Sequence, residues 1–429
     1  MSRGLGDVYK RQFLNNVVYK CASFSYRNIV IWGDKAKTLF RDYSFRIALK
    51  NGEYEGYPIV PIEQVASKIG VFKPETEERV HTLKIFDFIQ SGEFIVKYPE
   101  IAVWKIDNAT LFYSSDFILT NNQLIWHKFY AYNFTKNYPC DKFLIRRENN
   151  ILYIRKPYRI INVDVAFTLI GVHSHVWSHA LSEYFTKLSQ LQLVLDDAKC
   201  RVAILVPNYK DDQLKEVIYK EINKYTNVEI IIVNENEAVR TPIAYYVERP
   251  CKFTDHEDYV EIGDSVQPKI VSDIIKQNLV NPYLSSLSGL ETTPKYKLYL
   301  SRKNGKYRNL TNNDEVEQYF KDRGYFIFEP HTVSLEEKIR IFNNAEVIVG
   351  PFSSAFSNMI FSKSGTKVLM FTNYNRAFES WLCMHEQYFG MDMLLVTGQD
   401  TNTGNLAHCS YYIPLEKIER ACKHHGIPV

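Results

Sequence analysis

The arginine that closes one apolar run has the chemistry needed to hold a phosphorylated ligand. Arg302 ends the segment KYKLYLSR (295–302), which has the pattern of a short strand. A guanidinium presents a planar fork of N–H donors that matches two phosphate oxygens. Ligands of open α/β sheets bind outside the carboxyl ends of the strands. We therefore expect Arg302 to contact an anionic ligand, and a surface salt bridge is the alternative use of this side chain.

A second phosphate-type feature lies further along the chain. The apolar run EVIVGP (346–351) passes into a serine-rich loop and then into SSAFSNMIF (353–361), which we interpret as a helix. Small residues let backbone N–H groups approach a phosphate, and a helix start offers unpaired N–H groups and a positive dipole end. The residues that carry this expectation are Gly350, Ser353, Ser354, Ala355 and Asn358. The alternatives are a plain serine N-cap and, for Asn358, an amide that ties down the loop.

Three side chains of an earlier segment could move a proton. His179 and Glu183 are four residues apart, and His175 precedes His179 by the same interval, so in a helix they share one face. This helix is expected to open at the carboxyl end of DVAFTLI (164–170). A histidine or carboxylate there can act as a general base, and a histidine can also neutralise a diphosphate. An ordinary buried His–Glu pair is the alternative, and the spacing does not decide which of the three is the base.

Two blocks of alternating strands and helices are predicted to position these residues. In the second block the strands are 295–302, 324–330, 346–351 and 366–372, and the helices are 313–323, 334–345, 353–361 and 415–425. In the first block the strands are 164–170, 201–207, 228–234 and the strand-like run 239–250, and the helices are 176–193 and 211–225. A helical connection over 264–290 joins the blocks. This alternation predicts two Rossmann-like, doubly wound domains, at 161–290 and 291–429.

The N-terminal third has a different texture. Short runs with a period near two predict an antiparallel β region over residues 13–160, with one helix at 61–71. The runs are 28–33, 93–98, 100–106, 109–119, 143–147 and 151–155. The first dozen residues, MSRGLGDVYKRQ, resemble translated adapter sequence. We therefore leave Met1–Gln12 out of the fold prediction as artefact or disordered, and expect the true N-terminus to lie elsewhere.

Composition excludes several classes of protein. The chain has 429 residues with a net charge of +3, and its basic residues are spread out rather than gathered in a stripe, which argues against a nucleic-acid-binding protein. The seven cysteines are scattered with no C-x-x-C pair, as in a protein with free thiols from a reducing compartment. No apolar run approaches a membrane span, and we see no secretory signal. A G-x-G-x-x-G motif is absent, which argues against a dinucleotide site.

The segment 299–371 resembles glycosyltransferase family 61. The matching positions are Ser301, Arg302, Arg308, Asn309, Glu315, Gly324, Tyr325, Ser334, Glu337, Phe342, Ala345, Gly350, Asn358 and Phe361. Upstream, HSHVWSHALSEYFTKL resembles the family's H-W-x-x-E-x-L helix, with His179 and Glu183 in the His and Glu places and His175 or Trp177 as rival alignments. Two positions depart from the pattern. Phe352-Ser353 stands where the family has His-Gly, and Lys338 stands where it has Gln, which we interpret as subfamily divergence, with loss of activity as the alternative.

The resemblance implies a GT-B-like fold, with two Rossmann-like domains facing a cleft and a β-rich N-terminal extension. It implies an inverting glycosyltransferase that moves a hexosyl or pentosyl group from a nucleotide-sugar to a glycan acceptor. Donor binding is implied for Arg302 and Arg308. A contact to base or ribose is expected for Glu329, with a strand-terminating turn as its alternative, and a contact to ribose for Glu337. No cofactor is implied, and a required metal ion is not expected, because arginines and helix dipoles take its place. The acidic pairs Asp196-Asp197 and Asp211-Asp212 are interpreted as helix caps.

The setting expected from the resemblance is bacterial surface polysaccharide (capsule or lipopolysaccharide) assembly. The expected partners are the nucleotide-sugar and an oligosaccharide or lipid-linked acceptor. The expected location is the cytoplasm, with peripheral association at the inner membrane as a second option. Two other functions stay open: a pyruvyl or phosphate-linked transferase acting on surface glycans, and an inactive glycan-binding or scaffold protein. The first shares the phosphate loop without needing a site for a nucleotide base. The second rests on the change at Phe352-Ser353.

Overall fold

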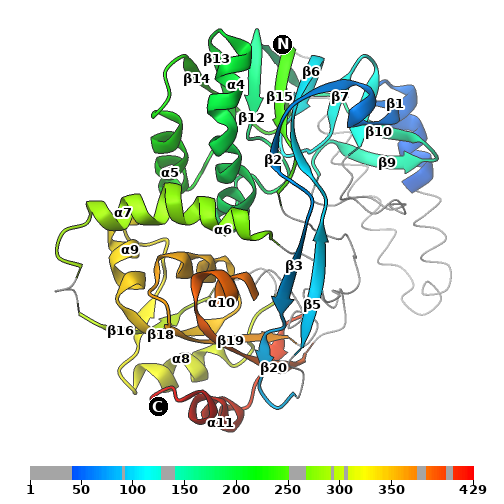
Figure 1. Ribbon diagram of the computed structural model, residues 1–429. Coiled ribbons are helices and arrows are strands. Elements are labelled where there is room, and N and C mark those ends of the chain that lie inside the picture. Colours follow the sequence, from blue (N-terminus) through cyan, green and yellow to red (C-terminus); the bar gives the residue numbers. More distant parts are fainter. Residues whose placement is uncertain are drawn as a thin grey trace, which may run out of the picture.

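The computed structural model shows a mixed α/β protein built on two large sheets (Figure 1). It describes residues 41–88, 92–126, 141–250, 267–290, 294–303, 308–373, 383–401 and 409–429. Met1–Gln12 and the strand expected at 28–33 lie outside these ranges. Among the described residues, none of the helices combines the length and apolar character that crossing a bilayer requires.

The first sheet joins the β-rich region and the first α/β block. Its strands, in spatial order, are β14 (Val228–Val233), β13 (Val202–Pro207), β12 (Val165–Thr168), β15 (Glu237–Val247), β6 (Ile101–Phe112), β7 (Ile118–Thr120), β8 (Gln123–Trp126), β1 (Tyr54–Pro61), β10 (Ile151–Arg155) and β9 (Leu144–Glu148). Off this path, β11 (Arg159–Asn162) pairs with β15 and β2 (Ala66–Lys73) with β6. β15 pairs in parallel with β12 and antiparallel with β6. The parallel and antiparallel parts therefore form one continuous sheet.

The prediction of a helix at 61–71 is wrong. β1 ends at Pro61, a single turn, η1, covers Ile62–Gln64, and β2 follows as a strand. β2 pairs antiparallel with β6, and the register shifts twice along the pair. The local apolar spacing suits a helix, but pairing with the long strand β6 overrides this weak local preference. The runs expected at 100–106 and 109–119 also differ, because β6 is one strand that continues through Phe112.

The helices of the first block follow β12 and β13, as predicted. The one expected at 176–193 begins at Trp177 and runs through Ala198, as α3 (Trp177–His179), the π-helical turn η2 (Ala180–Tyr184), the 3₁₀ segment η3 (Phe185–Gln190) and α4 (Leu191–Ala198). π turns are rare and are frequent at functional sites. α5 (Asp212–Ile222) is capped by Asp211, whose carboxylate accepts from the backbone N–H groups of Gln213 and Leu214, which confirms the cap expected there.

The second sheet confirms the strand–helix alternation predicted for the C-terminal block. Its order is β17 (Phe326–Phe328), β16 (Tyr296–Leu300), β18 (Ala345–Pro351), β19 (Lys367–Asn373), β20 (Asp392–Asp400) and β21 (Tyr411–Tyr412), and β4 (Lys84–Ile85) pairs with β20. The helices are α8 (Asn313–Lys321), α9 (Leu335–Asn343), the 3₁₀ helix η6 (Ser354–Phe361), α10 (Cys383–Phe389) and α11 (Leu415–His425). The strands from β17 to β20 are parallel, so their carboxyl ends share one edge.

Two connections hold the sheets together. The helical connection predicted over 264–290 is seen as α6 (Lys269–Ile275), η4 (Lys276–Val280) and α7 (Asn281–Ser286), which lie between the two blocks (Figure 1). The hairpin of β3 (Thr76–His81) and β5 (Glu93–Tyr98) reaches from the first block to the second, where the Tyr388 hydroxyl donates to Glu78 at 2.8 Å. One apolar core contains buried residues of both sheets, such as Phe167 and Ile348. Its continuity holds the two carboxyl edges in place.

Candidate active site

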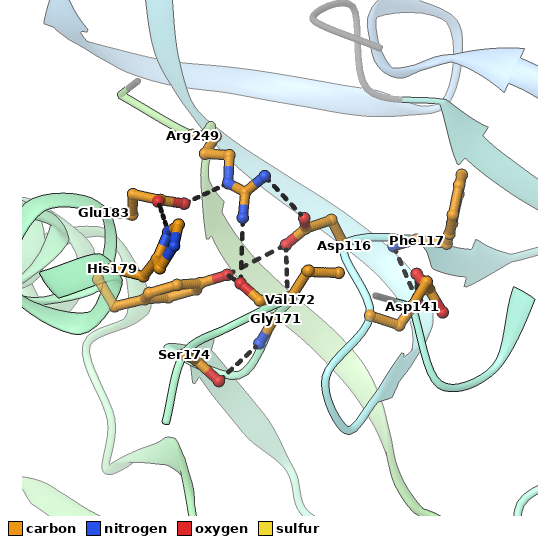
Figure 2. A network of polar contacts seen from close by, with 11 residues as sticks. Asp116, Phe117, Asp141, Gly171, Val172, Ser174, His179, Glu183 and Arg249 are labelled. Carbon is orange, nitrogen blue, oxygen red and sulfur yellow. Dashed lines mark hydrogen bonds and ion pairs between the residues drawn. The ribbon is translucent and has the colours of Figure 1, made fainter. Parts of the chain in front are cut away.

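The His179–Glu183 pair predicted from its spacing is formed. His179 Nδ1 lies 2.5 Å from Glu183 Oε1 (Figure 2). The Glu183 side chain is completely buried, whereas 27% of the His179 side chain is exposed. η2 carries Glu183 on the turn after His179, so the geometry follows from the i, i+4 relation within one helix. The imidazole is therefore the member of the pair that an outside molecule can reach.

Arg249, just after β15, holds the other side of the Glu183 carboxylate. Its Nε lies 2.5 Å from Glu183 Oε2, and its Nη1 lies 3.5 Å from Asp116 Oδ2. Figure 2 shows the guanidinium between the two carboxylates. Its Nη2 also donates to the Val172 carbonyl at 3.0 Å. Arg249 and Asp116 are both nearly fully buried, so one cation lies between two buried carboxylates.

The charges of this network keep Glu183 ionised. Burial by itself raises the pKa of the Glu183 carboxyl, but the positive charge of Arg249 and the interaction with His179 outweigh it and lower that pKa below its usual value. Tyr184 completes the network, because its hydroxyl donates to the Val172 carbonyl at 2.7 Å. Burial, and then the charge of Asp116, raise the pKa of Tyr184 well above its ordinary value, so Tyr184 remains a neutral donor.

His173, which the sequence analysis did not single out, lies beside His179. The centroids of the two rings are 4.8 Å apart. Burial, followed by the charges of His179 and Arg249, lowers the pKa of His173 to about 3, so this ring is neutral near pH 7. His175 differs from the expectation. The helix begins only at Trp177, so His175 precedes it and does not lie one turn before His179 on the same face. His175 is exposed, and burial of part of its ring lowers its pKa.

Arg302 and Arg308 both contact Phe352 at the carboxyl edge of the second sheet. Arg302 Nη1 donates to the Phe352 carbonyl at 2.5 Å, and the Arg308 guanidinium lies 5.4 Å from the centre of the Phe352 ring. The two arginines therefore meet at the loop predicted to bind phosphate. Phe352, which stands where the resemblance expects His, is buried.

The loop after β18 has the close backbone approach that the small residues predicted. A Cβ on Gly350, whose φ is 153°, would come within 2.6 Å of the Leu300 carbonyl oxygen. Ser353 precedes η6 without capping it through its side chain, so the plain N-cap alternative is not realised. Ser353 and Ala355 are half-buried and Ser354 is exposed. The first N–H groups of a 3₁₀ helix lack partners within it, which leaves donors at this loop.

Asn358, Glu329 and Glu337 each have different contacts. The Asn358 amide donates to the Ala355 carbonyl at 2.8 Å, as expected for an amide that ties down the loop, and its Oδ1 is buried with no hydrogen-bond partner among the described residues. Glu329 is half-buried and 3.6 Å from His331 Nε2. Glu337 is exposed in the first turn of α9. The structure does not bring Glu337 into contact with the arginines.

The carboxyl edges of the two sheets meet between α3 and α9. Lys338 Nζ, on α9, lies 3.9 Å from the centre of the Trp177 ring, on α3. The Gln213 side chain, on α5, donates to the Val333 carbonyl just before α9. α3 also packs against η6. The helix that carries His179 and the loop that carries Ser353 therefore approach each other, although they come from different blocks.

Sequence reasoning missed Asp116, His173, Arg249 and the contact made by Lys338. Arg249 had a usable signal, because it follows a strand just as Arg302 does. Asp116 had none, since it was assigned to a strand at 109–119 and lies in the turn between β6 and β7. Its link to Arg249 joins residues far apart in the chain, and nothing local predicts that.

The acidic pairs and the cysteines add no further site. Within the described ranges, no cluster of three or more His, Cys, Asp or Glu side chains is placed to hold a metal ion. Asp197 is not a cap: it accepts from Lys105 and Tyr245, and Asp196 accepts from Gln192. Cys200, Cys383, Cys409 and Cys422 are free thiols. Cys21, Cys140 and Cys251 lie outside the described residues.

Comparison with known proteins identifies a family for the central part of the chain. The model of the family described as glycosyltransferase 61 matches residues 177–369, a range that contains His179, Glu183, both loop arginines and η6. No curated protein matches the chain. A match to this family implies glycosyltransferase activity. The resemblance deduced from the Ser301-Arg302 block and the His179–Glu183 helix is thereby confirmed, because residues 177–369 match the glycosyltransferase 61 family.

Proposed function

We propose that this protein is an inverting glycosyltransferase that moves a sugar from a nucleotide-sugar to a glycan acceptor, in the assembly of a bacterial surface polysaccharide such as capsule or lipopolysaccharide. The observation that carries the proposal is the meeting of two features at one junction. The His179–Glu183–Arg249 network belongs to the first block, and the arginine-lined loop before η6 belongs to the second. Sugar transfer needs a base on one side of the sugar and charge stabilisation on the other. The proposal includes a GT-B-like fold, with two Rossmann-like domains facing a cleft, and the two α/β blocks support it.

His179 is the general base in this proposal, and Glu183 orients it. Glu183 is completely buried and is kept ionised by Arg249, so it is suited to accept a hydrogen bond from Nδ1–H. A proton on Nδ1 places the lone pair of the imidazole on Nε2. Nε2 then accepts the proton of the acceptor hydroxyl, and the resulting imidazolium is stabilised by the carboxylate.

The donor diphosphate binds at the second sheet. Arg302 and Arg308 supply positive charge, and the backbone N–H groups at Ser353 and Ser354 supply further donors. These groups stabilise the nucleoside diphosphate as it leaves, so that no bound metal ion is required. In this proposal Glu329 contacts the base or the ribose of the donor, and Glu337 contacts the ribose. The acceptor is an oligosaccharide or a lipid-linked glycan, and the enzyme works in the cytoplasm, at the inner membrane when the acceptor is lipid-linked.

Thermal unfolding with a panel of nucleoside diphosphates and nucleotide-sugars tests the donor site. One nucleotide should raise the Tm of the wild-type protein, and Arg302→Ala should abolish the rise. Arg420→Ala is the matched control, because Arg420 lies in the same block in an exposed ion pair with Asp87, and it should keep the rise. No response of the wild-type protein to any nucleotide contradicts the proposal.

A transfer assay with the donor identified in this way tests the base. His179→Ala should retain the nucleotide-induced rise in Tm and lose turnover by about 10²–10⁴-fold, the range for removal of a general base. His81→Ala is the control, since His81 is exposed in the hairpin β3–β5. Normal turnover in His179→Ala assigns the proton transfer to another residue.

A further inference from the structure

Lys338 is a buried cation whose amino group has no hydrogen-bond acceptor among the described residues. Only 3% of its surface is exposed. Its Nζ lies over the Trp177 ring, 3.9 Å from the ring centre. Lysine is almost never fully buried unless it is paired, because desolvation of the ammonium is costly. The Trp177 ring offsets part of that cost through a cation–π interaction, but it accepts no conventional hydrogen bond from the ammonium.

Trp177 shows the same deficit at the same place. Its Nε1 is buried and has no hydrogen-bond partner within the described ranges, although a buried indole N–H usually finds one. Lys338 Nζ lies over the ring to which this N–H belongs. Both groups are donors, so neither can satisfy the other. Two adjacent donors, of which the Trp177 N–H is buried, therefore indicate a site for a ligand that brings acceptor oxygens.

The position of this pair points to a phosphoryl group. α3 and α9 both pack against η6, the helix whose preceding loop carries Ser353 and Ser354. The negative charge of Asp211 raises the pKa of Lys338, but the Asp211 carboxylate is already used to cap α5. Burial lowers the pKa of Lys338 to about 8, so the amine still carries its proton for the most part near pH 7. A ligand with negative oxygens would stabilise that charged form.

The two departures from the family pattern are explained together by such a site. The loop has Phe352 where the family has His, and α9 has Lys338 where the family has Gln. Phe352 gives the loop an apolar side chain at this position, and Lys338 gives the neighbouring helix a cation. Because both positions contribute to one junction between the blocks, the cation on α9 is placed to do what a histidine in the loop can do elsewhere.

We propose that Lys338 Nζ and Trp177 Nε1 form an anion subsite that binds a phosphoryl oxygen of the donor, beside the loop of Ser353 and Ser354. The subsite deepens the proposed function and rests on it for the identity of the ligand. Lys338 supplies the charge that Phe352 cannot. Trp177 links the donor to the helix of His179, so that donor binding and the base share one rigid element.

The test compares affinities for a nucleoside diphosphate and for the matching nucleoside, measured by calorimetry on the full chain. Lys338→Gln restores the family's residue, and we expect it to weaken diphosphate binding about tenfold or more, as for loss of one charge-assisted hydrogen bond, with the nucleoside affinity unchanged. Lys338→Arg should keep most of the diphosphate affinity. Trp177→Phe keeps an aromatic ring but removes the N–H donor, so it should lose part of the diphosphate affinity. Lys363→Gln, an exposed lysine of the same block, is the control and should bind as the wild type does.

Each outcome decides for or against the subsite. Equal diphosphate affinity in Lys338→Gln and the wild type overturns it while leaving the proposed glycosyltransferase intact. Equal losses for nucleoside and diphosphate also overturn it, because they show a purely structural role. Binding of inorganic pyrophosphate tests the subsite independently of the nucleotide-sugar function. If the wild type binds pyrophosphate through Lys338 but binds no nucleotide, the subsite stands and the nucleotide-sugar function falls. Binding of neither overturns both.

Discussion

The Arg249 guanidinium lies 2.5 Å from Glu183 Oε2, so the carboxylate that holds His179 is itself held by an arginine from another element. Arg249 follows β15, whereas Glu183 lies in the π-helical turn η2. The pair is almost completely excluded from solvent. Removal of Arg249 leaves the buried carboxylates of Glu183 and Asp116 without this cation, and breaking a buried pair in this way costs about 3–5 kcal/mol.

Glu183→Gln should therefore lower both stability and turnover. The amide keeps the shape but removes the charge that favours the imidazolium, so kcat should fall by about 10²-fold or more, while the nucleotide-induced rise in Tm is retained. A transfer assay and thermal unfolding measure the two effects. Unchanged kcat in a folded Glu183→Gln protein would show that the pair is only structural.

Arg249→Met combined with Glu183→Gln forms a double-mutant cycle. Arg249→Met leaves the buried carboxylates of Glu183 and Asp116 without this cation, whereas the double variant leaves only that of Asp116. The double variant should therefore be less destabilised than the sum of the single ones. Denaturant unfolding measures the coupling. Strict additivity contradicts a direct ion pair. Arg201→Met with Glu229→Gln, an exposed pair, should show little coupling.

His173 should make the folded state sensitive to acid. Its pKa lies near 6.5 in an unfolded chain and is lowered to about 3 by burial in the folded protein. As pH falls below about 6.5 the unfolded chain takes up a proton that the folded protein refuses, so stability is lost from there toward pH 3. His173→Asn should flatten this decline, and asparagine tolerates the positive φ of 63° at this position. Denaturant unfolding of each variant at pH 7 and at pH 5 measures the loss of stability between the two pH values. His331→Asn, at an exposed histidine, is the control and should lose as much as the wild type. An equal loss in His173→Asn and the wild type contradicts the prediction.

Lys338 should change stability in the same direction as His173, but in an alkaline pH range. Its folded pKa of about 8 lies below the ordinary lysine value of 10.5, so without ligand the buried charge destabilises the protein below pH 8. Stability should rise as pH increases from about 8, because the unfolded chain then binds more protons than the folded one. Lys338→Gln should be more stable than the wild type at pH 7, with the difference shrinking by pH 9.5. A constant difference across this range would rule out the shifted lysine.

Gly350→Ala tests the close approach of β18 and β16. The new Cβ would meet the Leu300 carbonyl oxygen at 2.6 Å, and backbone cannot move as a flexible side chain does. Gly365→Ala is a matched control, with positive φ but open space around the new atom, and should cost about 1–2 kcal/mol from backbone strain alone. Gly350→Ala should cost more and should weaken nucleotide binding. Equal costs would show that the loop can shift.

Local sequence patterns were sufficient to predict the strands and helices of the second sheet and the His179–Glu183 pair of the site. The strands β16, β18 and β19 are short apolar runs separated by amphipathic helices. The Ser334 side chain caps α9 by accepting from the Glu337 backbone N–H. The helix at 61–71 failed because its apolar spacing is compatible with a helix while its real partner, β6, lies elsewhere in the chain. Pairing between distant strands is decided by burial that only the assembled sheet provides.

The sequence by itself determined the match of residues 177–369 to glycosyltransferase family 61, the α/β alternation and the pairing of His179 with Glu183. Each of these depends on residues close together along the chain. Only the tertiary structure decided that Arg249 and Asp116 complete that pair and that Lys338 lies against Trp177. These contacts join separate elements across the interior. Their strength comes from exclusion of water, which exists only once the two sheets have packed on one core.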